Sequence, residues 1–272
     1  MSLARTEWAR HLIYNPFIGC RAGGTSTGCK NCTARHTAMR NAYAFKNGSV
    51  RNAGFGHEAC THVLKNLENE KKVAWNGKVI YNPYATQRLE KLVSPREILV
   101  NMSGDVGCAN PEKLGWLLHK ITSKRLEQHF FTLVTKYPEV LEEALHGIKT
   151  PRNLGVYVSV EAEKLLHRVE VLRRLEDTIL KGVWLKPLVG PFNSKVDFTG
   201  MLDVVVSGEI ANNHRPMRME DLVKCAQAAN TANANFTIEA LSAKDWLSAK
   251  ERAELKRLKR ELRRRLKAKR KK

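Results

Sequence analysis

The sequence predicts an α/β fold in which parallel strands form a full or partial (β/α) barrel. Short apolar runs alternate with segments of helical periodicity over most of the chain, and the runs themselves are almost continuously apolar. Strands of that kind are typical of a parallel sheet that is covered on both faces. The length of 272 residues suits one such domain. A doubly wound open sheet is the alternative, and both folds bind ligands at the carboxyl ends of their strands.

The elements of this fold follow one another in a regular order. A loop-rich entry, residues 1–36, leads into helices expected at residues 32–46 and 58–70. Strands are then expected at residues 78–82, 97–103, 129–136, 154–161, 182–190, 202–209 and 235–240. Helical segments follow most of them, at residues 85–93, 111–122, 138–147, 162–176 and 219–232. We expect residues 1–245 to form the barrel domain and residues 246–272 to form a basic helical tail.

Polar residues follow most of the predicted strands directly. They are Asn101, Ser103 and Asp105; Thr135 and Lys136; Ser159 and Glu161; Lys186; Ser207, Gly208 and Glu209; and Glu239. Because the carboxyl ends of parallel strands meet at one edge of the sheet, we expect these residues to line one pocket. A Ser or Asp at such a junction can instead cap the next helix, and this role stays open for Ser103 and Asp105.

Half of the six cysteines are clustered near the N-terminus. Cys20, Cys29 and Cys32 have the spacing C-x8-C-x2-C, among glycines that let the backbone turn tightly. Thiolates of this kind favour zinc or an iron–sulfur cluster. The N-terminus lacks the apolar segment of a secretory signal, so a cytoplasmic protein without a disulfide framework is expected. The other cysteines are scattered and are expected to be small buried apolar side chains: Cys60, Cys108 and Cys225.

Two metal centres are compatible with the three clustered cysteines. A structural zinc ion takes four protein ligands, and His36, four residues after Cys32, could complete a Cys3His set. The alternative is a 4Fe–4S cluster held by the three cysteines, whose fourth iron stays open to a small-molecule ligand. Radical S-adenosylmethionine enzymes use that open iron to bind the methionine moiety. A three-cysteine loop ahead of an α/β barrel favours this second interpretation.

The chain carries a formal net charge of +20, and its C-terminal segment holds much of it. Residues 250–272 contain fourteen Lys or Arg and three Glu, which amounts to +11. A field of this sign attracts polyanions, so nucleic acid is the expected partner. A membrane is not expected, because the apolar stripe of this segment is narrow and holds no Trp or Phe. The expected nucleic-acid contacts are Lys256, Arg260, Arg263, Arg264 and Lys267.

Short motifs occur in a characteristic order between residue 7 and about residue 240. After Glu7 and Trp8 they read YNPFIGC, GCKNCTA, ILVNMSGDV, LVTKYPEVL, VYVSVE, KPLVGPF and VVVSGEIANNHRPM. In this order they resemble the phage three-Cys-motif protein family, which is radical-SAM-like. Lys186 stands where that family has an acid, which implies a different substrate pocket.

The resemblance implies a set of cofactor-binding residues. Cys20, Cys29 and Cys32 would hold a 4Fe–4S cluster. In the stretch Ser207, Gly208 and Glu209, the carboxylate would contact the amino group of S-adenosylmethionine. Ser159 and Glu161 would line the same mouth.

The expected function is that of a radical S-adenosylmethionine enzyme that modifies nucleic acid. The most specific expectation is an isomerase that rearranges a hypermodified thymidine base in phage DNA, a modification that protects against host nucleases. Its partners would be DNA, with RNA possible, and an electron donor such as a host flavodoxin or ferredoxin in the host cytoplasm. Two alternatives stay open: a zinc-stabilised nucleic-acid-binding protein without catalysis, and a tRNA-modifying radical S-adenosylmethionine enzyme.

Overall fold

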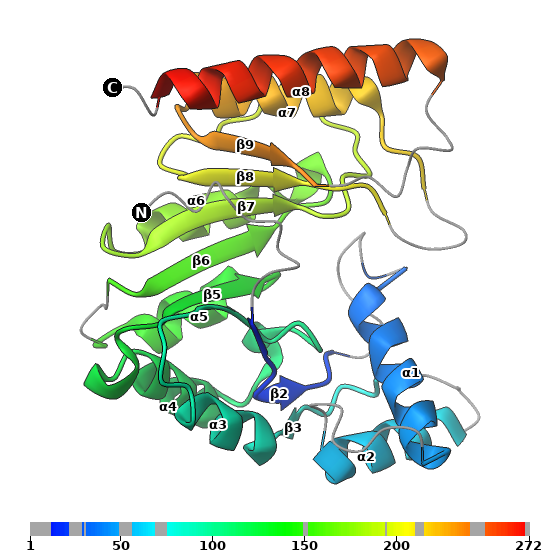
Figure 1. Ribbon diagram of the computed structural model, residues 1–272, viewed down its shortest axis with the longest axis vertical. Helices are drawn as coiled ribbons and strands as arrows, with labels where there is room; N and C mark the ends of the chain where they lie inside the picture. The colour runs from blue at the N-terminus through cyan, green and yellow to red at the C-terminus, as the bar shows by residue number, and fades with distance from the viewer. Residues whose placement is uncertain are drawn as a thin grey trace.

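The computed structural model describes residues 12–21, 29, 31–48, 56–68, 75–148, 152–193, 195–209, 215–239 and 248–269. For residues 252, 259, 262, 263 and 265–269 it describes the backbone alone. Within these ranges the chain forms a seven-stranded parallel sheet, a small two-stranded sheet and eight α-helices (Figure 1). The α/β fold class predicted from the sequence is therefore confirmed.

The strands of the large sheet are arranged in the order in which they occur along the chain. From one edge to the other they are β1 (Leu12–Tyr14), β4 (Glu97–Val100), β5 (Phe130–Thr135), β6 (Leu154–Ser159), β7 (Leu180–Leu185), β8 (Asp203–Val206) and β9 (Asn235–Ile238). All neighbours in this sheet are parallel. A doubly wound sheet reverses its order at a switch point, whereas this order runs in one direction, as in a barrel. Among the described residues β1 and β9 do not pair, so the sheet is open rather than closed.

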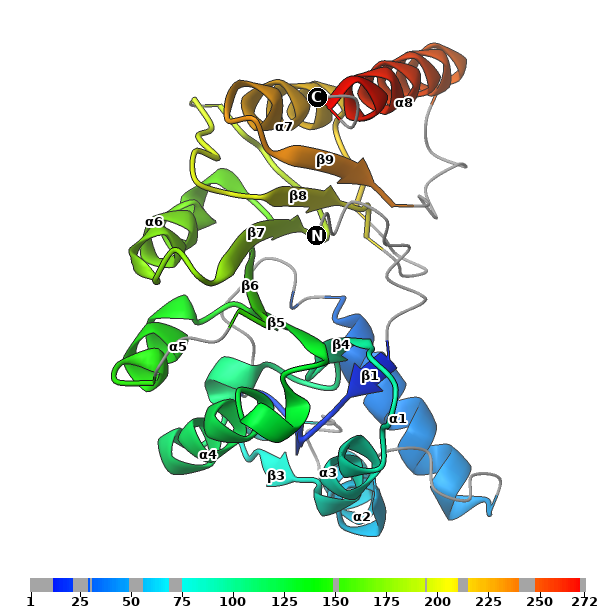
Figure 2. The ribbon, with the colours of Figure 1, turned by 60° about the vertical axis from the view of Figure 1, so that its left-hand side comes forward.

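The helices between successive strands cover one face of this sheet. They are α3 (Pro83–Glu90), α4 (Pro111–Ile121), α5 (Pro138–Leu145), α6 (His167–Arg174) and α7 (Met219–Thr231). In Figure 2, α4, α5 and α6 lie on the same side of the sheet, and α1 (Thr33–Lys46) lies on the other. Proline begins α3, α4 and α5. Its fixed φ suits the first helical turn, and the N–H that it lacks would have no partner within the helix there. Asn110 caps α4 by accepting a hydrogen bond from the backbone N–H of Glu112 at 2.9 Å.

One predicted strand has a different partner and direction. The sequence predicts that residues 78–82 begin the parallel sheet, but β3 (Ile80–Tyr81) pairs antiparallel with β2 (Phe17–Ile18) in the small sheet. The edge of the large sheet is instead β1, which lies inside the segment expected to be loop-rich. A strand of three residues is too short to show an apolar period, which explains why the sequence does not reveal it. The other six predicted strands are confirmed as shorter strands, and β7 begins at Leu180, before its predicted start at residue 182.

Apolar contacts on both faces of the sheet hold the layers together. The main core lies between the sheet and its outer helices, and it includes Phe131 and Leu172. A second cluster joins α1 and α2 (Gly56–Glu68), through residues such as Ala38 and Val63. A third cluster lies on the inner face and consists of Leu99, Tyr157, Trp184 and Val205. Because side chains alternate between the faces of a strand, residues at even spacing beyond this inner cluster also face inward.

The C-terminal helix α8 (Ala249–Lys269) packs against the domain. It lies beside α7 and β9 at one end of the sheet (Figures 1 and 2). Leu255 is buried in the main core, and Leu258 packs against it. The basic segment is therefore helical, as expected, and its described part is attached to the domain by apolar contacts.

Candidate active site

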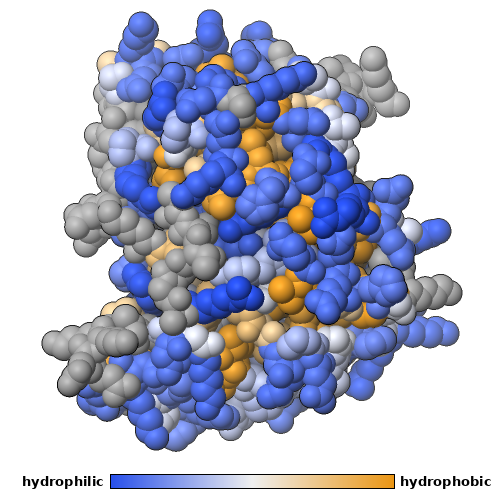
Figure 3. Space-filling view, turned by 180° about the vertical axis from the view of Figure 1, so that it is seen from behind, coloured by the Kyte–Doolittle hydropathy of each residue, from blue (hydrophilic) through white to orange (hydrophobic). Residues whose placement is uncertain are grey.

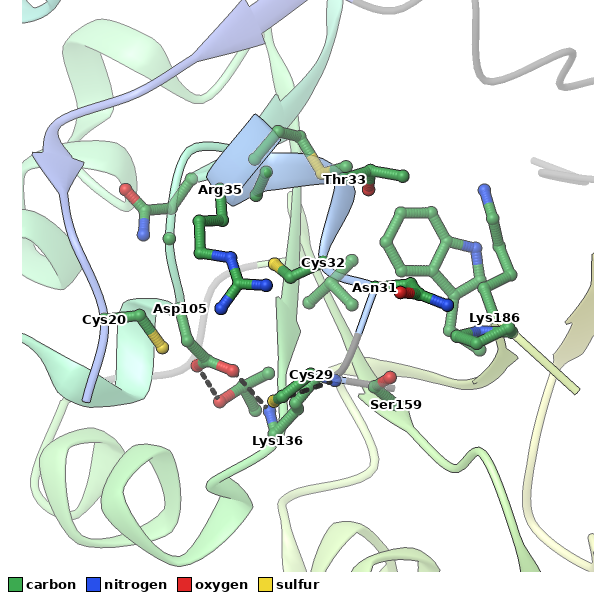
Figure 4. A pocket seen from close by; sticks show the side chains of 18 of the residues that line it. Cys20, Cys29, Asn31, Cys32, Thr33, Arg35, Asp105, Lys136, Ser159 and Lys186 are labelled. Carbon is green, nitrogen blue, oxygen red and sulfur yellow. Dashed lines mark hydrogen bonds between the residues drawn. The ribbon is translucent and has the colours of Figure 1, made fainter. Parts of the chain in front are cut away.

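A cavity of about 250 Å³ opens at the carboxyl ends of the parallel strands. One wall is formed by the cysteine segment and the first turn of α1, and the other by the ends of β4 to β8 (Figure 4). Val134 and Thr135 at the end of β5 line it together with Lys136, the next residue, and Trp184 on β7 lines it together with Lys186, just beyond that strand. Trp184 of the inner apolar cluster, with Met102 and Val134 that pack against this cluster, forms an apolar floor, and polar residues at the strand ends form the rim.

All three clustered cysteines line this cavity. Cys20 follows β2, Cys29 lies in the loop, and Cys32 occupies the N-cap position of α1. The three predicted ligands therefore line one cavity with strand ends that are far from them in sequence.

Cys20 is positioned by a close approach of two backbone segments. Gly19 forms a parallel bridge with Gly104, and its N–H donates to the carbonyl of Ser103 at 3.2 Å. Gly19 has a φ of +118°, and a Cβ on Gly104 would lie 2.1 Å from the carbonyl oxygen of Gly19. Glycine is thus required at both positions, because a side chain would push the first cysteine away from the end of β4.

The clustered cysteines and His36 do not form a single-ion site in the described part of the chain. Among the described residues, no group of three or more His, Cys, Asp or Glu side chains lies close enough together to hold one metal ion. His36, the proposed fourth zinc ligand, is exposed and is not among the residues that line the cavity. A cluster binds each cysteine at a different iron, so thiols spread around a cavity suit it, and thiolates are the ligands that iron–sulfur clusters select.

Lys136 links one cysteine to a buried ion-pair network. Its Nζ lies 3.7 Å from the sulfur of Cys29 and forms an ion pair with Glu161. Burial alone would lower the pKa of Lys136, because it favours the neutral amine. The Glu161 carboxylate and the Cys29 sulfur outweigh burial, so the pKa of Lys136 is raised. The Lys136 ammonium therefore places a positive charge beside the Cys29 sulfur.

Glu161 occupies a different place from the one predicted. It is completely buried and does not line the cavity. Its carboxylate accepts hydrogen bonds from Ser159 Oγ at 3.0 Å and from Arg168 Nη1 at 3.4 Å, in addition to Lys136. Glu161 therefore holds Lys136 through an ion pair without lining the cavity itself, whereas Ser159 lines the cavity as expected.

Ser207, Gly208 and Glu209 all line the cavity. The Glu209 carboxylate accepts hydrogen bonds from Asn31 Nδ2 at 2.9 Å and from the backbone N–H of Arg215 at 2.8 Å. Burial would favour the neutral acid, but the hydrogen bonds from Arg215 and Asn31 outweigh it and lower the pKa of Glu209. At the end of β8 the ionised Glu209 carboxylate is thus paired with the Arg215 guanidinium and tied to the cysteine loop through Asn31.

Asp105 has the capping role that the sequence left open. Its carboxylate accepts from Thr135 Oγ1 at 2.6 Å, from Lys136 N at 2.8 Å and from Gly107 N at 3.0 Å, which caps the 3-10 helix η3 (Val106–Cys108). Burial nevertheless raises the pKa of Asp105. Asp105 also lines the cavity, as predicted, and joins the ends of β4 and β5 there.

The family to which the chain belongs can be assigned over almost its whole length. Residues 4–269 match the model of a family described as "Protein of unknown function (DUF5131)". The chain belongs to this family. No curated protein and no solved structure matches it.

The region that defines the DUF5131 family includes both the cavity and α8. The matched range extends through the last described turn of α8, so the basic helix is part of the family pattern rather than an addition to it. Lys256, Arg260 and Arg264 are exposed on this helix, as a nucleic-acid contact requires. Arg263 and Lys267 belong to the helix, but their side chains lie outside the described part of the structure.

The surface of this DUF5131 protein is largely polar on the face opposite to that of Figure 1. Figure 3 shows hydrophilic side chains over most of this face, with apolar ones in strips between them. No helix in the described part of the chain has the length and apolar character needed to cross a membrane.

Sequence reasoning did not identify several residues of the site. Asn31 carries no signal beyond its place between two cysteines. Trp184 lies inside an apolar run, yet Lys186 Nζ sits 4.2 Å from the centre of its ring and pairs with Glu239. Burial lowers the pKa of Lys186, and Glu239 opposes this effect.

Cys108, expected to be an isolated apolar side chain, has its sulfur 3.7 Å from that of Cys20, whereas Cys60 and Cys225 are buried as predicted.

Proposed function

We propose that this protein is a radical S-adenosylmethionine enzyme with a partial (β/α) barrel that modifies nucleic acid. The observation that carries the proposal is that Cys20, Cys29 and Cys32 line one cavity together with the carboxyl ends of five neighbouring parallel strands. The resemblance of the motif order to the phage three-Cys-motif family supports the same assignment. A single-ion zinc site receives no such support, because His36 is exposed.

The three cavity cysteines would hold a 4Fe–4S cluster. The chemistry that such a group supplies when bound is one-electron reductive cleavage of a carbon–sulfur bond in S-adenosylmethionine. The Lys136 ammonium would lie beside the Cys29 ligand, and Glu161 and Arg168 would hold Lys136 in place. Trp184, the floor of the cavity, would exclude water from the reacting atoms.

Cofactor recognition would fall to the ends of β6 and β8. The negative charge of Glu209 suits the amino group of a bound methionine moiety, and the hydroxyls of Ser159 and Ser207 lie on the same wall. Asn101 adds a polar group: its backbone has a φ of 62°, and its Nδ2 is buried without a hydrogen-bond partner among the described residues. Buried donors of this kind are uncommon unless a ligand or water completes them.

Nucleic acid is the substrate class that the charge favours. The net charge of +20 and the exposed cations of α8 would hold a phosphate backbone. The reacting base would have to leave its stack to reach the cavity. The specific reaction we propose is the rearrangement of a hypermodified thymidine in phage DNA, with electrons from a host flavodoxin or ferredoxin in the host cytoplasm.

Anaerobic reconstitution with iron and sulfide tests the cofactor. We expect about four irons per chain and a broad absorbance near about 400 nm, followed by release of 5′-deoxyadenosine when S-adenosylmethionine and a reductant are added. Cys29→Ala should lose the iron, whereas Cys225→Ala, at a buried position in the main core, should retain it. A colourless protein with one zinc ion would overturn the proposal in favour of the non-catalytic alternative.

The substrate is tested separately with DNA that carries the modified base and with tRNA. The reconstituted protein is incubated with each polymer, and the nucleosides are then analysed by mass spectrometry. A change in mass or retention of the thymidine derivative supports the proposal. Turnover of tRNA alone would instead assign the protein as a tRNA-modifying enzyme.

A further inference from the structure

A fourth thiol lies next to the cysteine cavity without lining it. The sulfurs of Cys20 and Cys108 are 3.7 Å apart, which is van der Waals contact. Cys20 lines the cavity, whereas Cys108 is not among its lining residues. Cys108 thus contacts a residue that lines the cavity without itself being part of the lining.

Backbone contacts hold these two cysteines together. The Gly19–Gly104 bridge fixes the residue before Cys20 against the end of β4. Cys108 ends η3, where its N–H donates to the carbonyl of Asp105 at 3.0 Å. The Asp105 carboxylate then fixes η3 to the end of β5. The contact between the sulfurs is therefore built by two anchored segments rather than by chance meeting of mobile side chains.

The other cavity cysteines have different surroundings. The sulfur of Cys29 is next to the Lys136 ammonium, and Cys32 is fixed at the N-cap position of α1. A disulfide has a sulfur–sulfur bond of about 2.05 Å, so Cys20 and Cys108 need to approach each other by roughly 1.7 Å. Rotation of the two side chains toward neighbouring rotamers supplies movements of that size.

We propose that Cys20 and Cys108 are a redox-active pair that forms a reversible disulfide when Cys20 holds no metal. The oxidant is a small-molecule disulfide such as oxidised glutathione. Cys108, the more exposed of the two thiols, attacks it as the thiolate, forms a mixed disulfide and releases one glutathione thiol. Cys20 then attacks the sulfur of Cys108, loses its proton and releases the second glutathione thiol. The protein thiols lose two electrons and two protons in total, and the small-molecule disulfide gains them.

The disulfide has a direct consequence for the cavity. It removes Cys20 from the three thiols and leaves only Cys29 and Cys32 available to a metal centre. This consequence rests on the proposed function, whereas the disulfide itself depends only on the position of the two thiols. The pair would keep an empty site closed to metals and protect Cys20 from irreversible oxidation.

Peptide mapping of the full-length protein tests the pair. Protein freed of metal with a chelator is treated with oxidised glutathione, its remaining thiols are alkylated under denaturing conditions, and the digest is analysed by mass spectrometry without reduction. We expect a peptide that joins Cys20 to Cys108 and disappears after treatment with dithiothreitol. A dominant Cys29–Cys32 link, or no link to Cys108, would overturn the proposal.

Variants make the test specific to Cys108. In Cys108→Ser or Cys108→Ala protein treated in the same way, we expect no intramolecular link to Cys20, which stays free for alkylation or carries glutathione. Cys225→Ser, at a buried position on α7, should behave as the wild type. If the reduced protein takes up no iron, the proposed function fails but the disulfide stands. If iron binds but the linked peptide is missing, the inference fails alone.

Discussion

Asn31 Nδ2 donates a hydrogen bond of 2.9 Å to Glu209 Oε2, and this contact joins residues that are 178 positions apart in the chain. Asn31 lies between Cys29 and Cys32, and Glu209 lies just beyond the end of β8. The cysteine loop is therefore fastened to the far side of the cavity by a polar bond. This hydrogen bond couples the positions of the Cys29 and Cys32 thiols to that of the Glu209 carboxylate.

Asn31→Ala should loosen the cysteine loop. A hydrogen bond to a charged group contributes about 1.5–3 kcal/mol, and we expect a loss near the lower value because Arg215 keeps its contacts with Glu209. Alkylation of Cys29 and Cys32 in the metal-free protein should become faster. The matched variant is Asn41→Ala on α1, and equal alkylation rates in the two variants would contradict the role of Asn31.

Gly104→Ala should displace Cys20. The new Cβ would lie 2.1 Å from the backbone oxygen of Gly19, which cannot move like the end of a flexible side chain. We expect a lower free energy of unfolding by about 1–3 kcal/mol, as for other overpacked positions, and reduced iron uptake. Gly115→Ala on α4 meets no atom within 4 Å, and it should raise stability by up to about 1 kcal/mol. Denaturant unfolding of both variants checks this contrast, and a neutral Gly104→Ala would refute the close approach.

Asp203→Asn should change how stability depends on pH. Burial raises the pKa of Asp203, although Asn235 and Tyr157 donate hydrogen bonds to its carboxylate. The folded protein therefore retains a proton that the unfolded chain has already released. The unfolding free energy of the wild type relative to Asp203→Asn should fall as the pH rises from the ordinary value of 3.8 to the raised folded value, and then level off.

Asp197→Asn should change the pH dependence of the unfolding free energy in the direction opposite to that of Asp203→Asn. Hydrogen bonds from Thr199 lower the pKa of Asp197, so here the unfolded chain holds the proton longer. The wild type should gain stability relative to Asp197→Asn as the pH rises through the interval below 3.8. Parallel pH dependence of the two variants would show that the burial of Asp203 does not control its titration.

Neutralising α8 should weaken nucleic-acid binding more cleanly than deleting it, because Leu255 belongs to the core. In the triple variant Lys256→Gln, Arg260→Gln and Arg264→Gln, loss of three phosphate contacts would reduce the salt slope of binding to duplex DNA by about 2.7. Fluorescence anisotropy over a range of salt concentrations measures the slope.

The control for α8 lies before β5, at the amino ends of the strands. Lys124→Gln and Arg125→Gln change exposed cations of the 3-10 helix η4 (Lys124–Leu126), which precedes β5 and so lies at the amino ends of the strands. They should leave the salt slope almost unchanged. If the α8 variant and this control had the same slope, the positive charge of the whole protein, rather than α8, would attract the polymer.

Elements that rest on a repeated sequence pattern can be predicted from the sequence, whereas single contacts between residues far apart in the chain cannot. The buried strands β4 to β9 were predictable because each is a continuous apolar run, and the polar residues after them share an edge for the same reason. A short run such as residues 78–82 reveals a strand but not its partner, which explains the wrong assignment of β3. The burial of Glu161 behind Lys136 could not be foreseen, because a residue just beyond a strand can face either the cavity or the wall.

The cysteines illustrate the same difference. The spacing of Cys20, Cys29 and Cys32 predicted that they belong together, and they line one cavity. Cys108 is 88 residues from Cys20, and no local signal connects them. Their contact depends on the Gly19–Gly104 bridge, which forms only when the segment after β2 meets the end of β4.

The burial of Leu255 gives α8 a fixed place relative to the strands. A segment that becomes ordered only on binding loses conformational entropy at that moment, whereas α8 has already lost it during folding. A polymer bound along such a helix would be held at a constant separation from the mouth of the cavity. The fixed distance between this helix and the cavity would then determine which nucleotide of the bound strand lies opposite the cysteines.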